Sequence, residues 1–216
     1  MTTDRDLPSL TPDANSQHSP ACHTREVRWR VFCAIEIPVE MRQRLLQHVE
    51  KLRKAVPEAR ASWSHEGNTH LTLKFLGDIS RSVVNQISAA ASRAVLSIRR
   101  FPVSVEQTGV FPSRGTPRVL WIGINDATKI LGELHSRLEN ECATVGFSRD
   151  ERPFHPHITL ARLRKPQAAR SLAVTHKHLQ FEQATMTIEE LLVIRSELGG
   201  ERSKYTVISR HPLLDS

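Results

Sequence analysis

Residues 69–76 read THLTLKFL and residues 156–163 read PHITLARL, and the two stretches are identical at four of their eight positions. Both contain His-x-Thr-Leu, and Leu71 and Ile158 fill the variable position with similar side chains. Alternating polar and apolar residues are typical of a β-strand with one buried face. The repeat therefore indicates two related halves, each of which contributes one such strand.

The spacing of the repeat places its polar residues together. Residues i and i+2 of a strand point to the same face, so His70 and Thr72 emerge together while the leucines beside them enter the core. His157 and Thr159 have the same spacing in the second copy. If the two strands face one another, two imidazoles and two hydroxyls converge in one cleft.

These groups suit the cleavage of a phosphodiester. Imidazoles titrate near neutral pH, so one histidine can accept a proton while the other donates one. Threonine hydroxyls can donate hydrogen bonds to the anionic oxygens between them. A single His-x-Thr is more typical of a half-buried strand histidine. The matched duplication favours the catalytic interpretation, which is in-line cleavage of a phosphodiester without a metal.

The remaining periodicity predicts helices and strands in irregular order. Apolar residues at three- and four-residue intervals predict helices over 39–55, 83–94, 131–145 and 167–178, with Asp126 as a cap of the third helix and Gly146 at its end. Apolar, β-branched runs predict strands over 29–37, 62–76 (with a turn at 67–68), 102–110, 117–125, 157–163, 185–195 and 204–210. Because strands and helices do not alternate strictly, we expect an α+β fold.

Composition limits the class of protein. The 216 residues carry a net charge of +7 and 39% hydrophobic residues, which is typical of a soluble globular chain. Three cysteines without a CxxC pair predict neither a disulfide framework nor a thiolate metal site, and a reducing, cytoplasmic setting is the simplest interpretation. The apolar stretches are too short for a membrane helix, so we expect no membrane association.

The N-terminal segment differs from the rest of the chain. Residues 1–26 are rich in Pro, Ser, Thr, Asp and Asn, with two arginines against four acidic residues, and we expect a disordered tail without a secretory signal. The predicted domain, residues 27–216, therefore carries a net charge of +9. A basic body suits an anionic partner, although solvated basic faces that bind nothing are common.

Around the two motifs, the chain resembles the two-histidine phosphoesterases. The surrounding residues are similar to the branch of RNA 2′,3′-cyclic phosphodiesterases, also called 2′-5′ RNA ligases, over about residues 29–211. The matching stretches are 30–35 (RVFCAI), 68–77 (NTHLTLKFLG), 109–112 (GVFP), 118–121 (RVLW), 154–162 (FHPHITLAR) and 196–198 (SEL).

The resemblance implies a fold and an activity. It implies two pseudo-symmetric lobes, each an antiparallel sheet with helices packed outside, around a central cleft. It also implies hydrolysis of a terminal RNA 2′,3′-cyclic phosphate to a 2′-phosphate, without metal or other cofactor. We therefore expect an RNA or oligonucleotide with a cyclic phosphate end as the partner, and a monomeric enzyme.

The resemblance also implies roles for single residues. His70 matches the proton donor to the departing 3′ oxygen, and His157 matches the proton acceptor from the attacking water. Thr72 and Thr159 match the phosphate-binding threonines. Arg162 occupies a position where the family also carries arginine and could neutralise the phosphoryl charge. Strict alternation, however, places Arg162 on the face opposite His157, so either the strand twists or ends there or Arg162 is structural.

Other interpretations remain open. The same residues could join a cyclic phosphate to a 5′-hydroxyl by the reverse reaction, or the cleft could hold a phosphate without catalysis. The H-x-H pairs at 155–157 and 176–178 could bind metal, although we expect His176 and His178 at the surface of a helix end. A nucleobase could stack on Phe111, Phe154 or Trp121, although we expect Trp121 to pack in the core. The basic clusters 99–100 and 162–165 could follow an RNA backbone or form solvated faces.

Overall fold

The computed structural model describes residues 26–164, 168–199 and 202–215. Helices and antiparallel strands alternate irregularly in this part of the chain, so the expected α+β class is confirmed. No helix within these ranges is long and apolar enough to cross a membrane. The predicted tail lies outside the described residues except for Glu26, and the boundaries of the 27–216 domain remain a prediction.

Nine strands of the described chain form one sheet in the order β7-β4-β5-β6-β3-β1-β8-β9, with β2 paired to β6. All the strand pairs are antiparallel. The strands are β1 (Arg28–Glu36), β2 (Ala61–Trp63), β3 (His70–Ser80), β4 (Phe101–Phe111), β5 (Val119–Asn125), β6 (His157–Leu163), β7 (Ala184–Ile188), β8 (Glu190–Gly199) and β9 (Arg202–Pro212).

The sheet consists of two halves that meet at one residue pair. Strands β7, β4, β5 and β6 form one half, strands β3, β1, β8 and β9 form the other, and the pair Leu71↔Ile158 joins β3 to β6. Both residues are fully buried. The two motif strands are therefore the central strands of the sheet, and each half contributes one of them.

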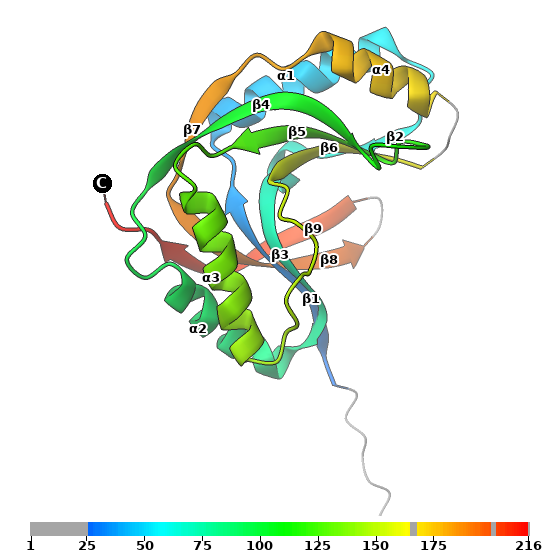
Figure 1. Ribbon diagram of the computed structural model, residues 1–216. Coiled ribbons are helices and arrows are strands. Elements are labelled where there is room, and N and C mark those ends of the chain that lie inside the picture. The colour runs from blue at the N-terminus through cyan, green and yellow to red at the C-terminus, as the bar shows by residue number, and fades with distance from the viewer. Residues whose placement is uncertain (1–25, 165–167, 200–201, 216) are drawn as a thin grey trace, which may run out of the picture.

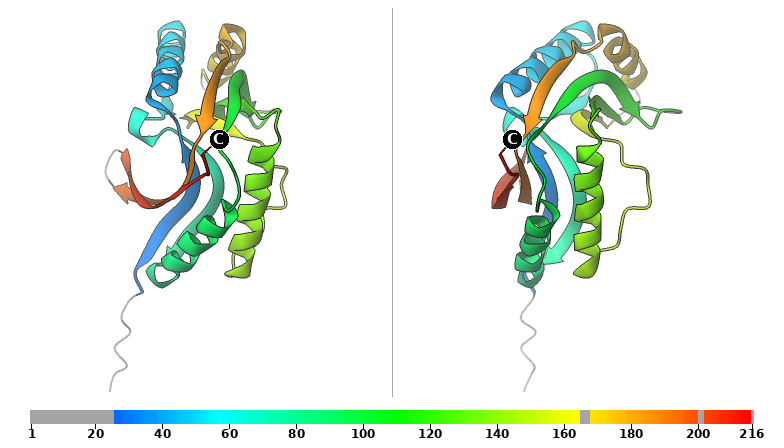
Figure 2. Two further views of the ribbon diagram at one scale, coloured as in Figure 1. Left: turned by 90° about the vertical axis from the view of Figure 1, so that its left-hand side faces the viewer. Right: turned by 60° about the vertical axis from the view of Figure 1, so that its left-hand side comes forward.

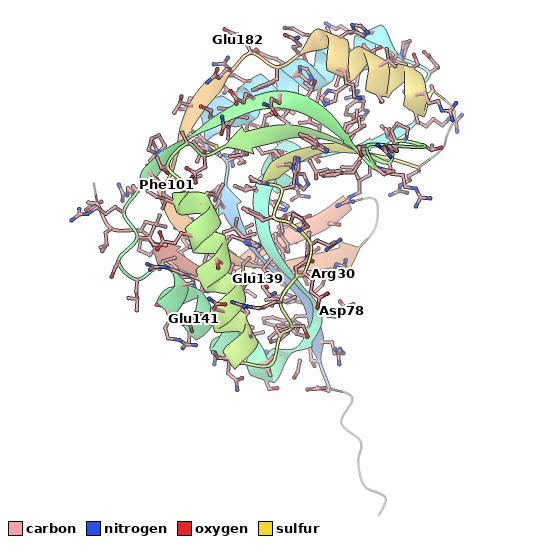
Figure 3. All side chains as sticks on the ribbon, in the orientation of Figure 1. Arg30, Asp78, Phe101, Glu139, Glu141 and Glu182 are labelled. Atoms are coloured by element: carbon pink, nitrogen blue, oxygen red, sulfur yellow. The ribbon has the colours of Figure 1, made fainter. Side chains whose placement is uncertain are left out.

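Two helices cover each half, and one helix of each pair comes from the chain segment of the other half. Helices α1 (Val39–Ala55) and α4 (Ala169–Leu179) lie side by side next to β4 and β5, while α2 (Val84–Ala94) and α3 (Ile130–Thr144) lie at the other end of the molecule (Figures 1 and 2). Helix α1 follows β1, and α3 follows β5, so both cross between the halves. An ion pair of 3.2 Å between Arg44 and Glu182 links α1 to the segment before β7. Figure 3 labels Glu182 in that segment.

Most of the predicted elements are confirmed, and the helix boundaries follow the local signals. Asp126 accepts a hydrogen bond of 2.7 Å from the backbone N–H of Leu131 and so caps the first turn of α3. Gly146 adopts a φ of 92°, the left-handed conformation that commonly follows a helix end.

Two predicted strands were wrong in extent. The predicted turn at 67–68 is confirmed as part of a 3-10 turn at Glu66–Asn68, but the strand after it, β3, continues to Ser80, four residues beyond the predicted end at Leu76. The predicted strand 185–195 is two strands, because the chain leaves β4 after Ile188 and then enters β8, which pairs with β9 from Glu190 and with β1 from Leu192. One apolar run thus supplies both halves of the sheet.

A buried ion pair lies between the sheet and α3. Lys74 on β3 donates a hydrogen bond of 2.7 Å to Glu139 on α3, and both side chains are about 5% exposed. Lys74 also donates to the carbonyl of Ser148, and the same Glu139 oxygen accepts from the backbone N–H of Asp150. The pair therefore ties the segment that leads toward β6 to the neighbouring strand and helix (Figure 3).

Candidate active site

The junction of the two halves brings the duplicated motifs together. Because Leu71 pairs with Ile158 in antiparallel register, His70 lies across from Thr159 and Thr72 lies across from His157. Alternation directs all four side chains to the face opposite the buried Leu71 and Ile158. The convergence that the spacing predicts therefore follows from a single residue pair.

The backbone carbonyl two residues earlier fixes the imidazole of His70. Its Nδ1 lies 2.8 Å from the carbonyl oxygen of Asn68, which can only accept, so Nδ1 carries the proton. The side chain of Asn68 in turn donates a hydrogen bond of 2.7 Å to the carbonyl of Ser203 on β9. The imidazole therefore presents Nε2 to the shared face of the sheet.

The second motif repeats this arrangement. Nδ1 of His157 lies 2.7 Å from the carbonyl oxygen of His155, so this ring also presents Nε2. Ser64, which directly follows β2, donates a hydrogen bond of 2.7 Å to the backbone carbonyl of Thr159. Two histidines in the same tautomer, with both Nε2 atoms available, can act as a base when neutral and as an acid when protonated.

Aromatic side chains surround both histidines. The ring centroids of Phe32 and Tyr205 lie 4.8 and 5.4 Å from that of His70, and the centroid of Phe111 lies 5.0 Å from that of His157. Neither Phe32 nor Tyr205 was among the predicted site residues. Tyr205 is the only tyrosine of the chain, but its strand pairs far from the motifs, so no local pattern identified it.

Trp121 packs next to the second histidine because a glycine faces it. Its centroid lies 4.7 Å from that of His155 and 6.1 Å from that of His157. A Cβ atom at Gly109 would come within 2.0 Å of the indole, so only glycine allows the ring to lie on β4. By contrast, Phe154 stacks on His135 of α3, with centroids 3.9 Å apart and an interplanar angle of 8°.

A β-bulge brings Arg162 to the same face as His157. Leu120 pairs with Ala161 and Trp121 pairs with Thr159, so Leu160 is the extra residue of β6. Leu160 and Ala161 are consequently both buried, and Arg162 is exposed. The expectation from strict alternation, which placed Arg162 on the opposite face, is wrong because the extra residue reverses the alternation.

The first motif contains a matching bulge. Lys74 pairs with Cys33 and Thr72 pairs with Ala34, so Leu73 is the extra residue of β3. Leu73 and Lys74 are both buried, and Phe75, the counterpart of Arg162, is 61% exposed. The two halves therefore share their local backbone irregularity as well as the motif.

Burial and neighbouring positive charge both favour neutral histidines. Burial is the main cause that lowers the pKa of His70 to about 4, and the charges of Arg162 and His157 lower it further, against the hydrogen bond to Asn68. Burial also lowers the pKa of His157, with contributions in the same direction from His155 and Arg162. Arg162 therefore acts electrostatically on both imidazoles.

The H-x-H pairs do not form a metal cluster in the described part of the chain. No group of three or more His, Cys, Asp or Glu side chains within those residues is arranged to hold a metal ion. The expected surface position of His176 is wrong, because its side chain is fully buried on the apolar face of α4. It contacts Nε2 of His48 through Nδ1 at 3.0 Å and the carbonyl of Trp121 through Nε2 at 3.0 Å. His178 is exposed, as expected.

The paired imidazoles on one face of the sheet have a geometry that suits acid–base chemistry on a phosphoester. The family model of the 2′-5′ RNA ligase superfamily matches residues 39–200. The chain therefore belongs to the 2′-5′ RNA ligase superfamily, which confirms the resemblance.

Curated relatives carry the name of one enzyme. The RNA 2′,3′-cyclic phosphodiesterase of Thermotoga maritima is 34% identical over 135 residues, which are 62% of this chain and 70% of the relative. The RNA 2′,3′-cyclic phosphodiesterase of Escherichia coli is 29% identical over 186 residues, which are 85% of this chain and 96% of the relative.

Solved structures share the fold. The crystal structure of TT0787 from Thermus thermophilus matches with a TM-score of 0.70 at 26% identity, over 85% of this chain and 97% of that chain. The crystal structure of Escherichia coli LigT complexed with 3′-AMP matches with a TM-score of 0.69 at 26% identity, over 87% and 99% of the two chains.

Proposed function

We propose that this protein hydrolyses terminal RNA 2′,3′-cyclic phosphates to 2′-phosphates by acid–base catalysis with His70 and His157. The observation that carries the proposal is the paired geometry of the two imidazoles. Each is fixed through Nδ1–H to the carbonyl two residues earlier, and the pair Leu71↔Ile158 places both on one face. The names of the curated relatives support the substrate class.

The proposed reaction moves two protons. His157, neutral at Nε2, takes a proton from the attacking water, and the resulting hydroxide forms a bond to phosphorus in line with the departing oxygen. His70, protonated at Nε2, donates its proton to the 3′ oxygen as the phosphorus–oxygen bond breaks. The products are a 2′-phosphate and a 3′-hydroxyl, and proton exchange with solvent restores the starting protonation states.

The remaining site residues stabilise charge. Thr72 and Thr159 donate hydrogen bonds to the non-bridging oxygens, and the Arg162 guanidinium balances the negative charge that develops on the phosphoryl group. Because imidazoles supply both proton transfers and Arg162 supplies positive charge, the proposed mechanism requires no metal.

A short RNA that ends in a 2′,3′-cyclic phosphate tests the proposal, with excess chelator present. We expect the wild-type protein to hydrolyse it and His70→Ala or His157→Ala to lower turnover by about 10²–10⁴-fold, the usual contribution of a positioned acid or base. His178→Ala, which replaces an exposed histidine of α4, is the matched control and should retain full activity.

Because the two histidines act as a unit, the double variant should be little slower than either single variant. Near-normal turnover by a folded single variant would contradict the assigned roles. Loss of activity with chelator, restored by added zinc or manganese, would instead favour a metal-dependent reaction.

A further inference from the structure

A basic groove of about 610 Å³ lies beside β2, at the end of β6 that is remote from His157. Three arginines from different segments line it: Arg53 from the last turn of α1, Arg60 just before β2 and Arg164 just after β6. We call this pocket, with its three arginines, the basic groove. Trp63 lines it as well, and neither the proposed mechanism nor its residues use this region.

The register of β2 connects the basic groove to the candidate active site. Ser62, which lines the groove, pairs with Arg162, and antiparallel partners point to the same face. Arg60 and Arg164 each lie two residues farther along their chains, so alternation places both on the face of Arg162. Two residues of extended chain span about 7 Å. Positive charge therefore continues from Arg162 to Arg60 and Arg164, and Arg53 adds a third charge from the end of α1.

The charges of the basic groove have no acidic partner among the described residues. All three arginines are exposed, and none forms an ion pair or side-chain hydrogen bond within the described ranges. Glu58 is near Arg60 in sequence but does not line the groove. Guanidinium groups gathered without carboxylates repel one another, and phosphate groups are the ligands that their geometry suits best.

Nucleic acid chemistry fixes what would lie here. The reacting nucleotide carries its cyclic phosphate at one end, and its 5′ oxygen links it to the rest of the strand. The strand must therefore leave the site in one direction, and the basic groove offers the positive path that begins at Arg162.

We infer that the basic groove binds the phosphates on the 5′ side of the cyclic phosphate, so that the preferred substrate is an oligoribonucleotide rather than a cyclic mononucleotide. The inference rests on the proposed function for the position of the reacting end. It adds a second binding site for the same strand, separate from the residues that perform the chemistry.

Kinetics with two substrates test the inference. The substrates are adenosine 2′,3′-cyclic phosphate and an oligoribonucleotide of about eight residues with the same cyclic end. We expect Arg53→Gln/Arg60→Gln/Arg164→Gln to lower kcat/KM for the oligonucleotide by about tenfold or more and to leave the mononucleotide unchanged. Since each contact with a single-stranded phosphate contributes about −0.7 to the slope of log(kcat/KM) against log salt, the slope should become shallower by about 2.

The control variant Arg28→Gln/Arg93→Gln/Arg149→Gln removes the same charge from exposed sites at the start of β1, in α2 and after α3, and it should behave as wild type. Equal loss on both substrates, or an unchanged oligonucleotide rate and salt slope, would overturn the inference while hydrolysis itself stands. If neither substrate is hydrolysed, the proposed function fails. Fluorescence anisotropy with the labelled oligonucleotide then tests the groove separately, by comparing binding to the wild type and to the triple variant. Weaker binding by the triple variant then supports the groove, whereas equal binding, or equal competition by an acidic peptide, refutes it.

Discussion

Arg162 shows most clearly how one backbone irregularity decides the chemistry of a single residue. Its charge lowers the pKa of both His70 and His157, in addition to the larger effect of burial. The unliganded protein therefore holds both imidazoles neutral at pH 7. The form with one neutral and one protonated histidine, which the proposed mechanism needs, is most populated on the acidic side of pH 6.5, the ordinary value for histidine.

The corresponding prediction concerns the pH dependence of kcat/KM, which reports the groups of the free enzyme. We expect a bell with its maximum below pH 6.5. Arg162→Gln removes a positive charge that lowers both pKa values, so the bell should move to higher pH. The variant should also lose about 10²–10³-fold in rate, because a group that stabilises the developing charge is lost.

Steady-state rates on a cyclic mononucleotide between pH 4 and 9 provide the measurement. Arg93→Gln on α2, which removes the same charge far from the motifs, is the control and should leave the bell in place. A bell that stays at the same pH in Arg162→Gln would show that the arginine does not act on the histidines.

At the scale of elements, the duplicated motif predicted the two central strands, and their register brings His70, Thr72, His157 and Thr159 to one face of the sheet. The side of Arg162 stayed open in the sequence, since period-two alternation does not include bulges. The consecutive apolar residues Leu160 and Ala161 were a local signal for that bulge. In the first motif the equivalent signal was hidden, because the second of the two buried residues is Lys74, which is charged.

The buried pair of Lys74 and Glu139 gives a stability prediction. Glu139→Leu leaves the ammonium of Lys74 buried without its carboxylate, and loss of one partner typically costs about 3–5 kcal/mol. Lys74→Met/Glu139→Leu removes both charges and should recover most of the free energy of unfolding. The control is Glu141→Leu, also on α3, which removes the partner of a surface ion pair with Arg93 of α2. It should cost at most about 1 kcal/mol.

Urea unfolding of the four proteins at one pH measures these differences. A double variant as unstable as Glu139→Leu would show that the side chains matter for their shape or for the hydrogen bonds to the 148–150 segment rather than for their mutual charge.

At the scale of the whole molecule, the repeat predicted two related halves but not how the chain divides between them. Helices α1 and α3 each cover the half to which their preceding strand does not belong. Amphipathic periodicity shows that a helix has a buried face, but it does not identify the partner of that face. The split between β7 and β8 was missed for a similar reason, since no glycine or proline marks the change of half at Glu189.

Hydrogen bonds between residues far apart in the sequence could not be predicted either. The main example is the buried pair of His48 and His176. The carbonyl of Trp121 can only accept, so His176 donates from Nε2 and accepts at Nδ1 from Nε2–H of His48. This chain of hydrogen bonds links α1, α4 and β5, and it requires that His176 be neutral. Protonation of His176 would place two N–H donors against each other.

Acid should therefore destabilise the fold well before the carboxylates titrate. Burial lowers the pKa of His48 to about 4 and also lowers that of His176, so the unfolded chain binds more protons below pH 6.5. His70, His135, His157 and His211 shift in the same direction. The stabilising contribution of these neutral histidines is fully present above pH 6.5 and is lost as the pH falls toward 4.

We expect the free energy of unfolding to decrease steadily from pH 7 to pH 5 in urea titrations. His176→Ala should be less stable at pH 7 by about 2–4 kcal/mol, because the Trp121 carbonyl and the His48 N–H both lose a buried partner. It should also depend less on pH, since a group that must be neutral in the folded state is gone. His178→Ala, which replaces an exposed histidine two residues farther along α4, should retain the wild-type slope. If His176→Ala and wild type lose stability in parallel between pH 7 and pH 5, the buried pair is not a source of the acid sensitivity, and the histidines of the candidate active site become the explanation to test next.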